Sequence, residues 1–211
     1  MTDPSNGYER IAAEFLSGRG GARTRSKGIG VKAVRAWART LPSGATVIDL
    51  GCGPGLPITE VLVSEGLNVY AIDAAPSLVD AFRRNLPGIH VACEAVEAST
   101  FFHRTFDGVL AWGLIFLLTA EEQRRLIHRT ADILVPGGRL LFTSCAGREP
   151  LVWTDAMTGL ESRSLGAVEY ERQLRAVGLS LIHEYEDEGE NHYFDALKNA
   201  SPVSSPSRAP N

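Results

Sequence analysis

The stretch from Thr46 to Glu60, T-V-I-D-L-G-C-G-P-G-L-P-I-T-E, constrains the fold of this chain more than any other. It starts with the β-branched and apolar residues of a buried strand, and it continues from Leu56 into a helical pattern. Between them lies a loop, residues 51–55, in which every second residue is glycine. Glycines permit positive φ angles and let a ligand approach the main chain. A strand, a glycine turn and a helix in this order predict a ligand-binding joint.

Strand and helix patterns alternate from Thr46 onwards. Strands are predicted at 46–50, 68–73, 89–93, 107–112 and 139–145, and helices at 56–65, 76–85 and 119–134. This alternation predicts an α/β fold with a doubly wound, mostly parallel sheet and helices on both faces. A helix at 166–177 follows, and then two strand-like runs at 179–186 and 191–197, separated by D-E-G-E. We therefore expect a C-terminal antiparallel hairpin that places an antiparallel strand at the sheet edge.

Two helical patterns, at 5–17 and from about 31 to 41, precede the first strand and enclose a basic, glycine-rich stretch. We expect residues 1–43 to form an N-terminal helical lid and residues 44–200 a Rossmann-like core, together a single domain over 1–200. The segment 151–164 has weak periodicity and is predicted to be an insertion. Residues 201–211, rich in Ser and Pro, are expected to form a disordered tail.

Composition argues against several classes of function. The formal net charge of −4, with both signs spread along the chain, disfavours a nucleic-acid-binding surface. No stretch reaches the roughly 18 apolar residues of a membrane span, and the N-terminus lacks the regions of a signal peptide. We therefore expect a cytoplasmic monomer or homodimer. Three distant cysteines fit free thiols, and five histidines without a close pair predict no metal site.

Two aspartates indicate what the glycine loop binds. Asp49 lies two residues before the first glycine, Gly51, where a carboxylate repels phosphate and favours an ammonium or sulfonium ion. Asp73 ends the next strand, 22 residues after Gly51, about the distance at which an acidic residue binds a ribose diol. Capping of the helix at 76–85 is an alternative role for Asp73, and the two roles are compatible. A dinucleotide fingerprint requires a small residue where Leu56 stands, so a phosphate-free, positively charged adenosine cofactor fits better.

Four motifs, in order, resemble those of the class I S-adenosylmethionine-dependent methyltransferases over about residues 8 to 198. They are V-I-D-L-G-C-G-P-G, A-I-D-A-A-P-S-L-V, the adenine-side segment C-E-A-V-E and the turn L-V-P-G-G-R-L-L-F before the fifth strand. The resemblance implies a seven-stranded Rossmann-like sheet with the last strand antiparallel. It also implies methyl transfer from S-adenosylmethionine, with S-adenosylhomocysteine as the product.

The resemblance implies roles for single residues as well. Asp49 would act near the ammonium group of the cofactor, Asp73 would hold its ribose, and Trp112 would flank it, unless Trp112 is an ordinary core aromatic. Tyr8, with one of Arg19, Arg23 or Lys27, would close over the cofactor carboxylate. The full set expected to bind the cofactor is Tyr8, Asp49, Gly51, Cys52, Gly53, Asp73, Ala74, Glu94, Ala95, Val96 and Trp112.

The methyl acceptor is less well defined by the sequence. The fourth strand ends in A-W-G-L, where amino-methylating enzymes of the family that act on nucleic acids and proteins carry N-P-P-Y or D-P-P-Y. His192 and Tyr193 are candidate catalytic residues, because a hairpin near the sheet end is expected to bring them toward the opening; exposed strand residues are the alternative. Arg163 is a candidate for binding an acidic acceptor, or else an ordinary surface arginine.

These features together predict an enzyme that methylates a small molecule, on oxygen or nitrogen rather than carbon. Two alternatives remain open. One is a nicotinamide-dependent oxidoreductase, which would have to bind a dinucleotide despite Asp49 and Leu56. The other is a non-catalytic S-adenosylmethionine-binding protein that keeps the cofactor pocket alone.

Overall fold

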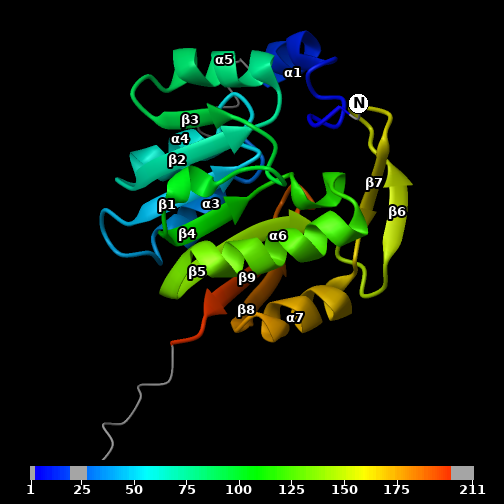
Figure 1. Cartoon of the computed structure of the whole chain (residues 1–211). Coiled ribbons are helices and arrows are strands. Elements are labelled where there is room, and N and C mark those ends of the chain that lie inside the picture. The colour runs from blue at the N-terminus through cyan, green and yellow to red at the C-terminus, as the bar shows by residue number, and fades with distance from the viewer. Residues whose placement is uncertain (1–2, 20–27, 201–211) are drawn as a thin grey trace, which may run out of the picture.

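A computed structural model describes residues 3–19 and 28–200, and a seven-stranded sheet forms its centre (Figure 1). The sheet order is β3-β2-β1-β4-β5-β9-β8, in which β1 to β5 are parallel. The strands are β1 (Thr46–Leu50), β2 (Asn68–Asp73), β3 (His90–Cys93), β4 (Phe106–Ala111), β5 (Leu134–Ser144), β8 (Leu179–Glu186) and β9 (His192–Lys198). The predicted doubly wound, mostly parallel sheet with a C-terminal antiparallel hairpin is confirmed.

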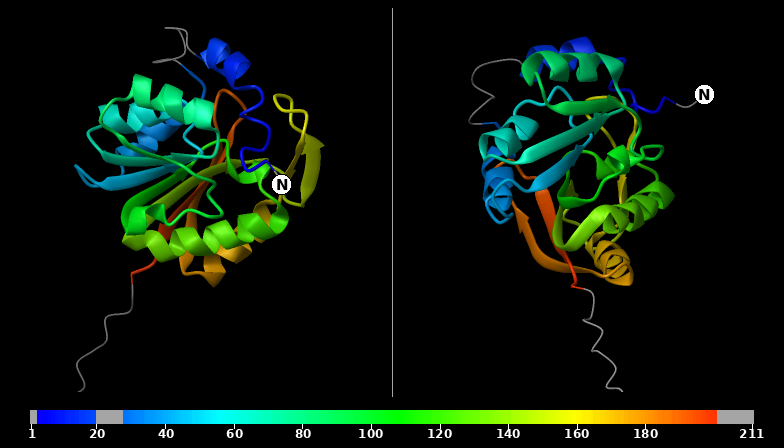
Figure 2. Two further views of the ribbon diagram at one scale, coloured as in Figure 1. Left: turned by 45° about the horizontal axis from the view of Figure 1, so that its top comes forward. Right: turned by 60° about the vertical axis from the view of Figure 1, so that its left-hand side comes forward.

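Helices cover both faces of the sheet, as Figure 2 shows. One face carries α3 (Val31–Ala38), α4 (Ile58–Ser64) and α5 (Pro76–Asn85), and the other carries α6 (Ala120–Ile133) and α7 (Ala167–Ala176). The short helix α1 (Ala12–Arg19) packs against α5, and two 3-10 turns, η1 (Phe101–His103) and η2 (Ile115–Leu117), flank β4. None of the helices in the described ranges is long and apolar enough to cross a membrane.

Alternation along each strand divides the core into two layers. In β1, Val47 contacts the α3 and α4 side, whereas Ile48 contacts the α6 and α7 side, and both are fully buried. Successive residues of β5, Leu141 and Phe142, divide in the same way. Because both faces are covered, the strands require continuous apolar runs, which is the pattern that the sequence shows.

The antiparallel strand does not lie at the sheet edge, contrary to the sequence-based expectation. β9 pairs with β5 on one side and β8 on the other, so β8 forms the edge. Burial explains this order, because Tyr193, Phe194 and Ala196 of β9 are inaccessible to solvent while β8 is largely exposed. Phe194 also stacks on Phe142 of β5, with ring centroids 4.9 Å apart.

Two further segments differ from the predicted pattern. Residues 4–11 form turns, and α1 begins only at Ala12, because Asn6 and Gly7 take positive φ angles of 47° and 84°. The predicted insertion at 151–164 contains a separate antiparallel hairpin of β6 (Leu151–Thr154) and β7 (Glu161–Ser164). Residues 20–27 of the basic, glycine-rich stretch, where the sequence predicts a loop over 17–30, and the predicted tail at 201–211 lie outside the described ranges.

Candidate functional site

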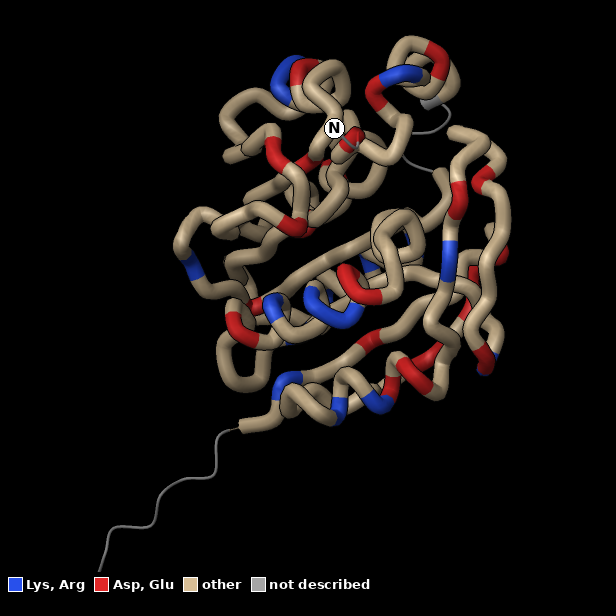
Figure 3. Tube along the Cα trace, turned by 45° about the vertical axis from the view of Figure 1, so that its right-hand side comes forward, with Lys and Arg blue, Asp and Glu red and all other residues tan. Residues whose placement is uncertain are grey.

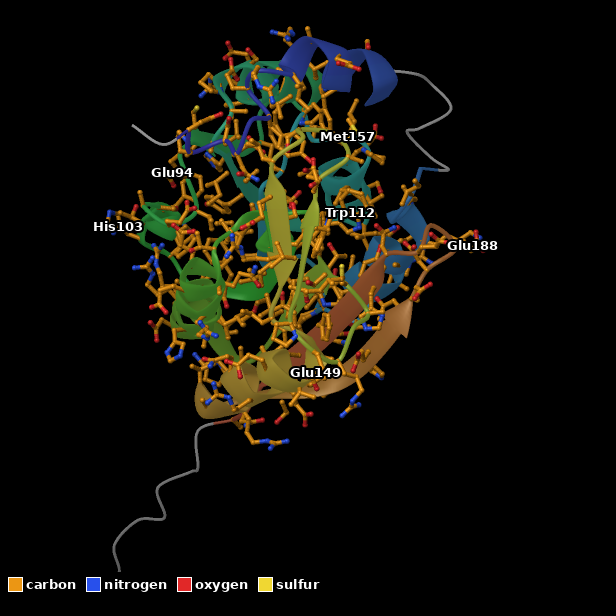
Figure 4. All side chains as sticks on the ribbon, turned by 90° about the vertical axis from the view of Figure 1, so that its right-hand side faces the viewer. Glu94, His103, Trp112, Glu149, Met157 and Glu188 are labelled. Atoms are coloured by element: carbon orange, nitrogen blue, oxygen red, sulfur yellow. The ribbon has the colours of Figure 1, made fainter. Side chains whose placement is uncertain are left out.

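A cavity of about 690 Å³ lies beyond the carboxyl ends of β1, β2 and β4, which is where ligands bind in open α/β sheets. Its volume falls within the usual range for small-molecule sites. The N-terminal segment 3–8 and the tip of the β6–β7 hairpin line it from the opposite side. All eleven residues that the sequence proposes for a cofactor line this one cavity. In the view of Figure 4, Glu94 lies toward one side of the molecule and Trp112 and Met157 toward the other.

The glycine loop after β1 forms the floor of the cavity. The backbone N–H groups of Gly51 and Cys52 both donate to the carbonyl of Ile72, which ties the loop to β2. Gly53 has a φ of 55°, and a Cβ added there would meet only the ring of Phe15, at 3.8 Å. Gly53 therefore leaves open space beside the main chain, as a closely approaching ligand requires.

Asp49 is a buried carboxylate at the end of β1, with 1% of its surface exposed. The hydroxyl of Thr59 donates to its Oδ2 at 2.6 Å. Burial raises the pKa of Asp49 to about 7, the Thr59 hydrogen bond opposes that rise, and the nearby charge of Asp73 adds to it. No cation of the described residues forms an ion pair with this carboxylate. The position is therefore suited to a positively charged ligand group.

Asp73 connects β2 to the glycine loop and to the start of α5. Its Oδ2 accepts the N–H of Gly53 at 2.8 Å, and its Oδ1 accepts the N–H of Ala75 at 2.8 Å. Burial raises the pKa of Asp73, and these two hydrogen bonds counteract the rise. Each carboxylate oxygen retains a lone pair for a further donor. The hydrogen bond to Ala75 shows that Asp73 supports the start of α5 as well as lining the cavity.

The segment after β3 presents main-chain donors. Arg129 of α6 holds it from outside by donating to the carbonyls of Val96 and Glu97 at 2.7 and 2.8 Å. Ser99 donates to the carboxylate of Glu94. Among the described residues, the backbone N–H of Val96 donates no hydrogen bond, although Val96 lines the cavity. An adenine ring nitrogen is the kind of acceptor such a group accommodates.

Trp112 lines the cavity at the end of β4 and is held from behind. Its Nε1 donates to the hydroxyl of Tyr193 at 3.0 Å, and that hydroxyl donates to Oδ2 of Asp187 at 2.7 Å. Gly30 approaches the indole so closely that an added Cβ would come within 2.7 Å of Nε1. The tryptophan is therefore fixed in place by hydrogen bonding and by packing.

The two candidate catalytic residues lie outside the cavity lining. Tyr193 is fully buried among side chains of the α3 and α4 layer, and burial followed by the hydrogen bond to Asp187 raises the pKa of its hydroxyl. His192 places its Nε2 2.8 Å from the carboxylate of Glu184 on β8. The expectation that the hairpin brings them to the opening is not met, because β9 lies inside the sheet and directs both side chains into its two faces.

The N-terminal segment is anchored to both sides of the cavity. Glu9 accepts hydrogen bonds from the backbone N–H and the hydroxyl of Ser77, at the start of α5. Arg10 donates to the carbonyl of Thr158 in the β6–β7 turn at 2.7 Å. Tyr8 packs edge-on against Phe15, with centroids 5.3 Å apart. The side chain of Arg19, and Arg23 and Lys27, lie outside what the structure describes, so their proposed contact with the cofactor remains a prediction.

The cavity lining also includes residues to which the sequence assigned no role or only a general one. Leu114, Phe116 and Leu117 come from the loop and turn after β4, and Asp155 and Met157 come from the β6–β7 turn. The only sequence feature that indicated these residues was the weak periodicity of 151–164, which predicted an insertion. Arg163 of the same hairpin pairs with Glu161 and is not part of the lining. The structure therefore offers no geometric support for an acidic acceptor bound by Arg163.

Comparison with known proteins finds similarity to methyltransferases. Residues 47–138 match the family model of a methyltransferase domain. A ubiquinone biosynthesis O-methyltransferase of Xanthomonas axonopodis pv. citri is 35% identical over 129 residues, which are 59% of this chain and 52% of that protein. The chain spans about half the length of the curated relatives it matches.

Solved structures show the same fold at low sequence identity. A TehB-like methyltransferase from Corynebacterium glutamicum superposes with a TM-score of 0.70 at 19% identity, covering 90% of this chain and 99% of that one. The 1,6-didemethyltoxoflavin-N1-methyltransferase of Burkholderia thailandensis superposes with a TM-score of 0.66 at 18% identity, covering 94% and 92%. The latter structure contains S-adenosylhomocysteine and 1,6-didemethyltoxoflavin.

Proposed function

We propose that this chain is a class I S-adenosylmethionine-dependent methyltransferase and that it transfers a methyl group from that cofactor to an oxygen or nitrogen atom of a small molecule. The observation that carries the proposal is the convergence of Asp49, Asp73 and the free N–H of Val96 on one cavity. They provide, respectively, a partner for an ammonium group, acceptors for a ribose diol and a donor for adenine.

The residues present fit this cofactor. Asp49 is a buried carboxylate with no cation partner among the described residues, which suits an ammonium or sulfonium ion and disfavours phosphate. The open space beside Gly53 accepts the methionine portion, and Asp73 has unused lone pairs for the ribose hydroxyls. When bound, S-adenosylmethionine supplies a methyl group activated by its sulfonium charge.

The contribution of the protein to the reaction is mainly positioning. The main chain at Gly51 and Gly53 and the fixed indole of Trp112 hold one reactant, and the opposite end of the cavity holds the acceptor. The N-terminal segment, anchored at Ser77 and Thr158, covers the reactants and excludes water. Orienting two reactants in this way contributes up to roughly 7–11 kcal/mol in favourable systems. Neither His192 nor Tyr193 is needed for this proposal.

Calorimetric titration with S-adenosylhomocysteine and, separately, with NADH tests the cofactor. We expect S-adenosylhomocysteine to bind with one site per chain and NADH not to bind, and binding of NADH alone would overturn the proposal. Release of S-adenosylhomocysteine from S-adenosylmethionine in the presence of mixed small-molecule acceptors then tests for turnover. Cofactor binding without turnover on any acceptor class would favour a binding protein over an enzyme.

A further inference from the structure

The β6–β7 turn contributes a buried carboxylate to the acceptor end of the cavity. Asp155 has only 8% of its surface exposed, and it lines the cavity together with Met157, which is half exposed at the rim. The backbone N–H of Asp155 donates to the carbonyl of Leu160 at 2.7 Å, which closes the turn beneath it. The side chain is therefore held in a fixed position at the cavity wall.

The two oxygens of this carboxylate are used unequally. Oδ1 accepts hydrogen bonds from the backbone N–H groups of Met157 and Thr158, at 3.0 and 2.7 Å, and from the hydroxyl of Thr158 at 3.0 Å. Oδ2 accepts none from any described residue, and no Lys, Arg or His of the described residues forms an ion pair with it. Oδ2 can therefore accept a hydrogen bond from a ligand, and a cationic donor makes the strongest hydrogen bond to a carboxylate.

The rest of the lining has the same electrostatic character. Seven Asp and Glu residues line the cavity, and no Lys, Arg or His among the described residues does so. In the backbone trace of Figure 3, Lys and Arg residues occur along the helices that cover the sheet. An acidic acceptor would meet repulsion here, whereas a cationic one would be attracted. Glu122, the other carboxylate near this end, already accepts two hydrogen bonds from Thr119 at its Oε2 and is only partly buried.

Apolar side chains complete the acceptor end. Phe116 and Leu117 line it beside Met157. The ring of Phe116 is supported by Trp153 of β6, with centroids 5.8 Å apart. An apolar wall with one convergent polar group is the usual composition of a site that orients a small molecule.

We infer that the methyl acceptor is a small molecule with an apolar or aromatic scaffold and a cationic amine, and that Oδ2 of Asp155 binds this amine. The inference rests on the proposed function and deepens it, because it names the class of acceptor. Asp155 acts in it as a specificity-determining residue. The amine is a recognition group, and the atom that receives the methyl group is not specified by this contact.

The test compares matched aromatic fragments on protein saturated with S-adenosylhomocysteine. Tyramine, 4-hydroxyphenylacetamide and 4-hydroxyphenylacetate share a ring and differ in carrying an ammonium, a neutral amide or a carboxylate. Their dissociation constants are measured by ligand-observed NMR on the unaltered protein and on Asp155→Asn. The Asn variant keeps an oxygen that accepts the hydrogen bonds at Oδ1, so the turn is retained while the charge is removed. Glu161→Gln, on the same hairpin and outside the cavity lining, is the matched control.

We expect the unaltered protein and Glu161→Gln to bind tyramine at least about tenfold more tightly than the amide and the carboxylate. Asp155→Asn should bind S-adenosylhomocysteine unchanged and lose the preference for tyramine. Absence of the preference in the unaltered protein, or its retention in Asp155→Asn, would overturn the inference. Failure of S-adenosylhomocysteine to bind in the calorimetric titration would instead refute the proposed function.

Discussion

Replacing Asp49 by Asn is expected to stabilise the ligand-free protein at pH 8 and, at the same time, to weaken its binding of S-adenosylhomocysteine. The carboxyl group is buried, and its pKa rises from 3.8 to about 7, mainly through desolvation. The folded protein therefore holds this proton up to about pH 7, whereas the unfolded chain releases it near pH 4. The contribution of Asp49 to the free energy of unfolding is fully present below about pH 4. It is lost as the pH rises from about 4 to about 7, and it stays lost above pH 7.

The size of this loss of stability follows from the difference between the pKa values of Asp49 in the folded protein and in the unfolded chain. Each pH unit between the two pKa values costs about 1.4 kcal/mol, so the range from pH 5 to pH 7 amounts to about 3 kcal/mol. Asparagine has the same shape and no charge, and its carbonyl still accepts the hydroxyl of Thr59. Between pH 5 and pH 8 the free energy of unfolding of the unaltered protein should therefore fall by about 3 kcal/mol more than that of Asp49→Asn.

Chemical denaturation at pH 5 and pH 8, without ligand, measures the first effect. Calorimetric titration with S-adenosylhomocysteine from pH 6 to pH 8 measures the second. In the unaltered protein the affinity should rise about tenfold from pH 6 to pH 8, about fivefold of it below pH 7, and level off above pH 8, because the ionised carboxylate binds the ammonium group. In Asp49→Asn the affinity at pH 8 should be about 10-fold to 100-fold lower than in the unaltered protein. It should also lack the rise between pH 6 and pH 8, because the variant has no carboxyl group at this position.

Thr59→Val provides the matched control. The fully buried hydroxyl of Thr59 lowers the pKa of Asp49, so its removal should shift the rise in affinity to higher pH. If Asp49→Asn shows the same pH dependence of unfolding as the unaltered protein, the raised pKa is refuted. If it binds S-adenosylhomocysteine as tightly as before at pH 8, the role of Asp49 at the ammonium group is refuted.

Three further substitutions test other parts of the site. Asp73→Ala should weaken binding of S-adenosylhomocysteine by about 1–3 kcal/mol in calorimetry, because ribose hydroxyls lose their acceptors, and an unchanged affinity would remove Asp73 from the site. Tyr193→Phe should lower the free energy of unfolding by about 1–3 kcal/mol in urea, because the indole N–H and the Asp187 carboxylate lose their shared partner; equal stability would show that this chain of hydrogen bonds is unimportant. Gly55→Ala should destabilise the fold more than Gly53→Ala. A Cβ at position 55 would lie 2.7 Å from a methyl carbon of Leu86, whereas a Cβ at position 53 would meet nothing closer than 3.8 Å. The reverse order of melting temperatures would contradict this packing.

Local patterns in the sequence predicted the central part of the fold well. The helix expected at 76–85 is observed as Pro76–Asn85, because proline at the first helical position marks its start. Strands β1 and β2 match their predicted ranges because both are bounded by turn residues and are buried on both faces. The same locality explains the cofactor side of the cavity, where each residue follows a strand end. Parallel strands bring such positions together at one edge of the sheet.

Features that depend on pairing between distant segments were not predicted. The position of β9 between β5 and β8 depends on contacts such as Phe194 against Phe142, which are 52 positions apart in the chain. A strand inside the sheet directs its side chains into both covered faces, so Tyr193 is buried instead of facing an opening. The hairpin of β6 and β7 was missed because E-S-R-S is short and polar, and only pairing with L-V-W-T makes it a strand. Asp155 gains its place at the cavity from that pairing.

The acidic lining of the empty cavity lowers the stability of the fold, and binding of a cation would offset this loss. Burial raises the pKa of both Asp49 and Asp73, and Asp155 keeps one oxygen without a partner among the described residues. A neutral residue of the same shape at position 49 would give a more stable ligand-free domain, because a buried charge without a partner opposes folding. A positively charged cofactor supplies the missing partner at Asp49, and a cationic acceptor supplies it at Asp155. The charges that lower the stability of the empty protein are thus the same ones that select its ligands, so a gain in stability from Asp49→Asn should be accompanied by a loss of binding.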